Sequence, residues 1–420
     1  MSTIKTVLKN LGPGLLFASM AIGTSHLVLS TKAGAQYGWL MVIPIILANV
    51  FKYPFFEFGV RYTNVTNKTL IEGYLNRGKG YLWFYAGITL ITTFTILAAL
   101  YTVTSGLFIN LFEISASAIP IAHIALALFV FISILLIVGR YALLENSLKI
   151  VVSILFLALI ITTLLVIYKG KVATVSDFTP PTIFNEAGIL FLISLMGWMP
   201  TTVEASSWVS LWSIEKWKGQ KQKPSLKESL TEFNTGYLIT SILAIFFLII
   251  GWFTLYGTNT QLSGNAITFA DQVVQIFTTH IGSWAYLFIA LSAFATMFST
   301  CMTAHDAVTR VSIDIIDLLA PKAHIQGKKS FFALGVLTLA IVNFIVIAAF
   351  SANMGTLVAL ATFVSFVVAP IIGYMNLKNV MSNDIPLEYR PKKWLQILTY
   401  AGIVFLSFFS IYYFYIEVFN

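Results

Sequence analysis

Residues 11–38 read LGPGLLFASMAIGTSHLVLSTKAGAQYG, and this stretch decides the fold. An apolar run long enough to cross a bilayer is interrupted in its middle by Gly23-Thr24-Ser25-His26. Because hydrocarbon offers no water to replace lost backbone hydrogen bonds, such a break is stable only where protein or a water-filled cavity surrounds it. The stretch therefore predicts a membrane helix that unwinds at a functional centre.

A second break of the same kind follows at residues 197–202, which read GWMPTT inside the sixth apolar run. Spans one and six are five spans apart, so two five-helix units that begin with these breaks are inverted relative to each other, as in many transporters. We expect one all-α polytopic membrane domain, 1–420, with repeats at about 11–168 and 187–376 and an extra helix at about 394–417. Eleven apolar runs support this count, at about 12–34, 38–57, 81–112, 119–139, 149–168, 187–212, 233–256, 281–304, 331–350, 355–376 and 394–417.

The composition excludes a soluble protein. Of 420 residues, 58% are hydrophobic and 10% charged, and the mean hydropathy is +0.86. The net charge of +8 does not indicate nucleic-acid binding, because it follows the predicted topology: of the 25 Lys and Arg residues, all but Lys32, Lys169 and Lys171 fall on one side. This bias predicts a multi-pass protein of the plasma membrane with a cytoplasmic N-terminus and an external C-terminus. The single cysteine, Cys301, excludes an intrachain disulfide.

Two short segments resemble a known family. Leu11–Gly14, the break at Gly23–His26 and the run Ala33–Gly38 resemble the opening of the Nramp divalent-metal transporters, and Met199-Pro200 resembles the second half of their signature. The resemblance implies a LeuT-type fold with broken helices one and six. It also implies proton-coupled import of manganese, iron and related ions.

The departures from the family pattern are informative. Where the family has Asp-Pro-Gly-Asn, this chain has Gly23–His26, so the metal-binding carboxylate is absent. Where the family has Met-Pro-His, the chain has Met199, Pro200 and Thr201, and Met196 replaces a small residue. The acid pair that the family places in span three falls on Ala98 and Tyr101. We therefore expect altered metal selectivity and weak or absent proton coupling.

The residues left at the two breaks form an electrically neutral set. Imidazole and thioether groups suit transition metals better than magnesium or calcium, so His26, Met196 and Met199 are the candidate metal ligands. A structural histidine that bonds its surroundings is the alternative for His26. The full predicted substrate site is Gly23, Thr24, Ser25, His26, Met196, Met199 and Thr201.

Other polar residues of the apolar runs suggest coupling groups. Glu204 is an acid inside span six, which makes it a functional candidate, although a carboxyl bonded to neighbouring hydroxyls is an equal alternative. Ser299, Thr300 and Thr303 of span eight are candidates for a second-cation site, such as a sodium site, or bond their own backbone. We interpret Lys52 with Glu57, and Asp306 with Arg310, as ion pairs at helix ends.

The leading interpretation is an Nramp-like secondary transporter of divalent metal cations. One alternative is a LeuT-type carrier of a small neutral or zwitterionic organic solute, possibly sodium-coupled, and another is an Nramp-related magnesium transporter. A sensor or scaffold is disfavoured, because the sequence has no soluble signalling domain. No enzyme motif is present, so we expect no catalytic activity and no cofactor. The lipid bilayer is an expected partner, whereas nucleic acid and an obligate protein partner are not.

Overall fold

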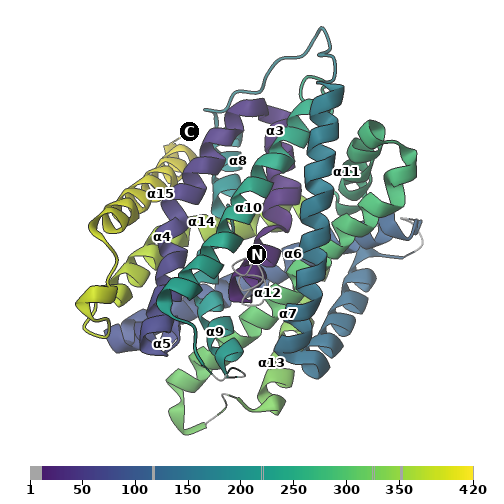
Figure 1. Cartoon of the computed structure of the whole chain (residues 1–420). Coiled ribbons are helices and arrows are strands. Elements are labelled where there is room, and N and C mark those ends of the chain that lie inside the picture. Colours follow the sequence, from purple (N-terminus) through teal and green to yellow (C-terminus); the bar gives the residue numbers. More distant parts are fainter. Residues whose placement is uncertain are drawn as a thin grey trace, which may run out of the picture.

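The computed structural model describes residues 12–115, 119–218, 220, 222–323, 325, 327–350 and 353–419. Within these residues the chain is helical, with no strands (Figure 1). The first apolar run forms three short pieces, namely α2 (Pro13–Ala21), the π-helix η1 (Ser25–Ser30) and α3 (Thr31–Tyr37). Proline at the first position of α2 suits a helix start, since that backbone nitrogen has no partner within the helix.

The remaining predicted spans all have helical counterparts. Eight segments of the described chain are long and apolar enough to cross a membrane, and one of them, Ser25–Thr66, joins the end of span one to span two. Span six is divided between α8 and α9, and span five is the apolar end of α7. The helices concerned are α4 (Val42–Thr66), α6 (Lys79–Leu111), α7 (Ile121–Lys169), α8 (Glu186–Gly197), α9 (Ala205–Trp217), α10 (Leu226–Thr254), α12 (Tyr286–Leu319), α13 (Lys329–Ala349), α14 (Met354–Val380) and α15 (Lys393–Phe419).

Several helix boundaries differ from the prediction. The expected interruption between the runs 119–139 and 149–168 is wrong, because α7 is helical over all 49 residues from Ile121 to Lys169. The eighth span does not end at 304, since α12 continues to Leu319. Charged and polar residues ended the predicted run there, but a buried helix continues through such residues when neighbouring helices satisfy them. The structure also contains two short helices that were not predicted, α5 (Leu70–Arg77) and α11 (Ala266–Ile281).

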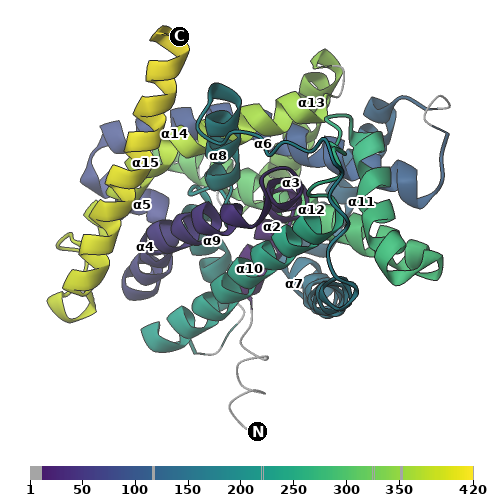
Figure 2. The same ribbon diagram turned by 90° about the horizontal axis from the view of Figure 1, so that it is seen from above.

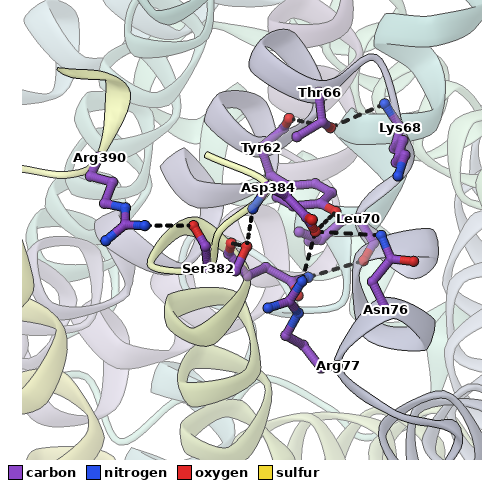
Figure 3. Close-up of polar contacts among 10 residues, drawn as sticks. Tyr62, Thr66, Lys68, Leu70, Asn76, Arg77, Ser382, Asp384 and Arg390 are labelled. Atoms are coloured by element: carbon purple, nitrogen blue, oxygen red, sulfur yellow. Dashed lines mark hydrogen bonds and ion pairs between the residues drawn. The ribbon is translucent and has the colours of Figure 1, made fainter. Parts of the chain in front are cut away.

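The connecting segments gather at two opposite ends, as the span count requires. At one end Arg77 of α5 donates to Asp384 at 2.7 Å, and Tyr62 of α4 donates to the same carboxylate at 3.1 Å (Figure 3). At the other end the Val172 amide donates to the Phe253 carbonyl at 2.9 Å, and the Gly355 amide to the Gly264 carbonyl at 3.0 Å. Figure 1 shows the C-terminus at the same end as the long loop that follows α7. The N-inside orientation and the number of crossings on which it rests stay predictions.

Helix α15 packs on the outside of the bundle, where the extra helix was expected (Figure 1). The centroid of the Phe405 ring in α15 lies 4.8 Å from the centroid of the Phe51 ring in α4. The division of the chain into two repeats stays a prediction of the sequence pattern.

Helix α10 crosses α3 at very short range, and glycine makes this approach possible (Figure 2). A Cβ atom at Gly34 would overlap the Leu248 carbonyl oxygen of α10, and a Cβ atom at Gly251 would overlap the Thr31 carbonyl oxygen of α3. Small residues commonly allow such contacts between membrane helices. The contact holds the second half of helix one against α10.

We therefore expect Gly34→Val to destabilise the folded protein by about 1–3 kcal/mol or more, because the new atoms meet backbone that cannot move aside as a side chain can. Thermal unfolding of the purified protein in detergent measures the effect. Gly87→Val is the matched control, since a Cβ atom at Gly87 has nothing within 4 Å. Equal melting temperatures for the two variants would contradict this account of the crossing.

Candidate functional site

The two breaks meet each other. Residues 22–24 separate α2 from η1, and residues 198–204 separate α8 from α9. The Ser25 hydroxyl oxygen lies 3.2 Å from the Pro200 carbonyl oxygen, which joins the first break to the second. The prediction that both spans unwind near Gly23 and Gly197 and face each other is confirmed.

A small cavity lies where the breaks meet helices α6 and α12. Its volume is about 20 Å³, which is room for one water molecule or one ion. Five serine and threonine residues, one methionine and two tryptophans line it together with aliphatic residues, and no acidic residue among the described ones does so. The lining residues are Met20, Thr24, Ser25, Ile96, Leu100, Trp198, Thr201, Thr202, Trp208, Thr300 and Ala304.

His26 lies beside this cavity and not in its lining. Its Nε2 atom is 2.8 Å from the Thr240 carbonyl oxygen of α10, and its Nδ1 atom is 2.7 Å from the Ser25 hydroxyl. Because a carbonyl only accepts, Nε2 carries the hydrogen and donates it. Both ring nitrogens are thus engaged, which favours the structural alternative for His26. Through Ser25, which does line the cavity, the imidazole holds the break in place.

The thioether of the cavity comes from Met20, which the sequence analysis did not select. Met20 lies one helical turn before Gly23, on α2. Met196 and Met199 are buried but outside the lining, so the structure does not bring the two predicted thioether ligands to the cavity. Gly23 lies between the lining residues Met20 and Thr24, and its Cα faces Thr300. Of the predicted substrate-site residues, Thr24, Ser25 and Thr201 line the cavity.

Lys52 of α4 reaches the second break from the side. Its Nζ atom donates to the carbonyls of Met196, Gly197 and Met199 at 2.9 Å each and to that of Thr201 at 3.1 Å. The predicted pair of Lys52 with Glu57 is therefore wrong. The lysine side chain has four methylene groups and is long enough to reach the neighbouring broken helix. There, carbonyls without helical partners replace the water that the ammonium loses.

The other predicted helix pair is present, and Glu57 has a different partner. Glu57 pairs with Arg61, one turn further along α4. Arg310 pairs with Asp306 at 2.8 Å as expected, but the pair lies within α12 and not at its end. Both pairs have the i, i+4 spacing that neighbours on a helix surface require.

Glu204 lies at the start of α9, on the same unwound segment that holds Lys52. The Thr202 hydroxyl donates to its Oε2 atom, and its Oε1 atom has no hydrogen-bond partner among the described residues. Glu204 is buried and interacts electrostatically with Lys52. The carboxyl is not part of the cavity lining, but the neighbouring Thr202 is.

Comparison with known proteins now decides the family. The family described as Natural resistance-associated macrophage protein-like, Nramp, matches residues 14–416. The chain belongs to the Nramp family. The uncharacterized protein PM0681 of Pasteurella multocida (strain Pm70) is 31% identical over 403 residues, which are 96% of this chain and 90% of that protein.

Solved structures show that this Nramp chain has a LeuT-type fold. The Eremococcus coleocola manganese transporter in complex with an aromatic bis-isothiourea substituted compound is similar with a TM-score of 0.72 and 14% identity, over 100% of this chain and 88% of that one. MhsT in complex with L-phenylalanine is similar with a TM-score of 0.65 and 12% identity, over 96% and 97%. Mhp1, a nucleobase-cation-symport-1 family transporter, has a TM-score of 0.60 and 13% identity, over 96% and 92%. With its apolar helices, the chain is a multi-pass membrane protein.

Helix α12 of this Nramp protein contacts the first break through the residues predicted as a second-cation site. Thr300 lines the cavity, and its hydroxyl donates to the Ser19 carbonyl at 3.0 Å. The Ser19 hydroxyl donates to that of Ser299 at 3.2 Å. All three hydroxyls also bond the backbone of their own helix, since those of Ser299 and Thr300 lie 2.7 and 3.1 Å from the Thr296 carbonyl oxygen and that of Thr303 lies 2.8 Å from the Ser299 carbonyl oxygen. The structure thus brings Ser299 and Thr300 to helix one, and the sodium site stays a prediction.

Helix α6 places uncharged groups where the family resemblance implies acids. The Ala98 amide donates to the side-chain oxygen of Asn343 at 3.1 Å. The Tyr101 hydroxyl lies 2.9 Å from Nδ1 of His305, whose Nε2 lies 3.0 Å from the Val336 carbonyl oxygen. His305, buried on α12, was missed because its sequence neighbours Asp306 and Arg310 marked the end of the predicted run.

Proposed function

We propose that this protein is a secondary transporter that carries a divalent metal cation through the cavity between its two broken helices. The size of the cavity is the main support, since about 20 Å³ accommodates a single ion and no amino acid or nucleobase. Membership of the Nramp family supports the same substrate class. The protein is not an enzyme in this proposal, and the bilayer is the plasma membrane, with the N-terminus on the cytoplasmic side.

The lining determines which divalent ions are favoured. Hydroxyl oxygens from both breaks and from α12 provide hard donors, and the Met20 thioether provides a soft one. With no carboxylate in the described lining, full dehydration of the ion beside neutral groups is costly, and an ion that keeps part of its water requires a wider cavity than the present one. Manganese, iron and cadmium are then favoured over magnesium, which prefers oxygen ligands alone.

A small neutral or zwitterionic organic solute is the second candidate. It is favoured by the uncharged lining and by the two indole rings of Trp198 and Trp208 in the cavity wall. The fixed charge of Lys52, 3.1 Å from the Thr201 carbonyl, also disfavours a cation nearby. Such a solute requires a wider cavity, and therefore an opening of the breaks.

Uptake into proteoliposomes distinguishes the two candidates. Manganese, cadmium and magnesium, with several neutral amino acids, are tested in parallel with and without a sodium gradient. We expect uptake of manganese or cadmium that Met20→Leu weakens more for cadmium than for manganese, because leucine has a similar volume but no sulfur. Uptake of an organic solute with no uptake of metal would support the second candidate.

The uncharged span three predicts weak proton coupling. Ala98 cannot titrate, and Tyr101 is hydrogen-bonded to His305, so neither replaces a carboxylate relay near neutral pH. We expect metal uptake to change less than about twofold with an imposed pH gradient, since no proton is obligatorily carried. A pH-sensitive dye inside the vesicles measures the accompanying proton flux. Proton influx that scales with uptake would contradict weak coupling, and its loss in Glu204→Gln with metal uptake retained would show a relay through Glu204.

A further inference from the structure

The ammonium of Lys52 occupies a cage of backbone oxygens. Four carbonyls surround Nζ at 2.9–3.1 Å, from Met196, Gly197, Met199 and Thr201, and the side chain is fully buried. These carbonyls belong to the break between α8 and α9, where they have lost the helical partners that they would otherwise have. The cage thus exists because helix six is unwound, and α4 supplies the cation that fills it.

The charge distribution around the cage suits any small cation. The carbonyls of Met196 and Gly197 end α8, and the C-terminal end of a helix carries partial negative charge. Glu204 on the same segment adds a carboxylate that interacts with Lys52. An ammonium has only three hydrogens for the four oxygens, so one hydrogen is shared. Rings of backbone carbonyls at such distances also replace the hydration shell of bare monovalent ions.

We propose that the break of helix six forms a monovalent-cation site that Lys52 permanently occupies as a tethered cation. The side chain holds the four carbonyls together and keeps exchangeable ions out of the break. The transported substrate is thereby confined to the hydroxyl-lined cavity on the other side of Thr201. Lys52 is then a positioning residue, and small primary ammonium ions are the ligand class that fits the cage when the side chain is shortened.

The inference makes a prediction about an alanine variant. Lys52→Ala leaves an empty cage, so its melting temperature in detergent should fall by several degrees. Methylammonium chloride should restore most of this loss, because methylammonium presents the same three N–H donors and binding to the folded state alone stabilises it. Tetramethylammonium chloride at equal concentration should not, since it has no N–H group and is too large for the cage.

Two control variants separate the cage from other roles of the side chain. Lys52→Met keeps the length of the side chain without its charge, so it should be destabilised and methylammonium should not rescue it. Lys393→Ala removes an exposed lysine at the start of α15 and should melt like the wild type in every salt. The inference would be overturned by a Lys52→Met variant as stable as the wild type, or by a Lys52→Ala variant whose melting temperature does not rise with methylammonium.

A measurement on the unaltered protein covers the case in which Lys52→Ala does not fold. Reductive methylation of the full chain in detergent, followed by mass spectrometry, should modify Lys393 rapidly and Lys52 at least a hundredfold more slowly. Methylation of both lysines at similar rates would show that the ammonium leaves the cage and would refute a permanent occupant. These measurements need no transport, so they succeed or fail independently of the proposed function.

Discussion

Gly23→Val is expected to reduce uptake by the transporter about 10–100-fold while the protein still folds. A Cβ atom at Gly23 would lie 2.6 Å from Cγ2 and 2.7 Å from Oγ1 of Thr300, which lines the cavity. Thr300 cannot rotate away easily, because a β-branched side chain is stiff and its hydroxyl bonds the Ser19 carbonyl. Overpacking costs about 1–3 kcal/mol, and because Thr300 lines the cavity, relieving the clash with valine changes the shape of the cavity. Initial uptake rates in proteoliposomes measure the effect.

A compensating change shows whether the clash with Thr300 is the cause. Thr300→Ser removes the methyl carbon, which is one of the two Thr300 atoms that a Cβ atom at Gly23 meets, and keeps the hydroxyl oxygen. The double variant Gly23→Ala with Thr300→Ser should therefore transport better than Gly23→Ala alone. Gly87→Val, which adds the same side chain in open space, should transport like the wild type. If the serine substitution gives no recovery, the methyl group of Thr300 is not the cause of the defect.

The breaks could be predicted from the sequence because glycine, proline and hydroxyl residues are conspicuous inside an apolar run. The composition of Gly23–His26 and of residues 197–202 marked both positions, and the structure confirms that they meet. The ends of the bundle could also be predicted, because charged residues gather in the connecting segments. The interruption predicted within α7 shows the limit of this signal, since charged residues also occur inside a continuous helix.

The side chains that face the cavity could not be predicted in the same way. An unwound segment has no 3.6-residue period, so the sequence does not say which of its residues share a face. Met199 therefore stays a predicted ligand, and the structure adds Met20, in the regular helix before the break, to the cavity lining. Lys52 was assigned to a nearby partner, Glu57, because sequence spacing indicates only local pairs. Its true partners lie 144 to 149 residues away.

Glu204→Gln is expected to destabilise the protein strongly, because it removes the carboxylate that balances the buried charge of Lys52. The Lys52 ammonium donates to the carbonyl of Thr201, three residues before Glu204, and both side chains are buried. Removing one partner of a buried pair of charges costs up to about 3–5 kcal/mol, since the other charge is left uncompensated. Equilibrium unfolding in mixed micelles measures the change. Glu388→Gln, which neutralises an exposed acid, is the matched control and should have little effect.

The interaction itself is measured by combining Glu204→Gln with Lys52→Met. If each single variant leaves one uncompensated charge, the double variant leaves none. The loss of unfolding free energy in the double variant should then be smaller than the sum of the two single losses by about 0.5–3 kcal/mol. The carbonyl cage stays unfilled in the double variant, so part of the loss should remain. Strictly additive changes would show that Glu204 does not balance Lys52. The carboxylate would then act on its surroundings through Thr202, whose hydroxyl donates to it and lines the cavity.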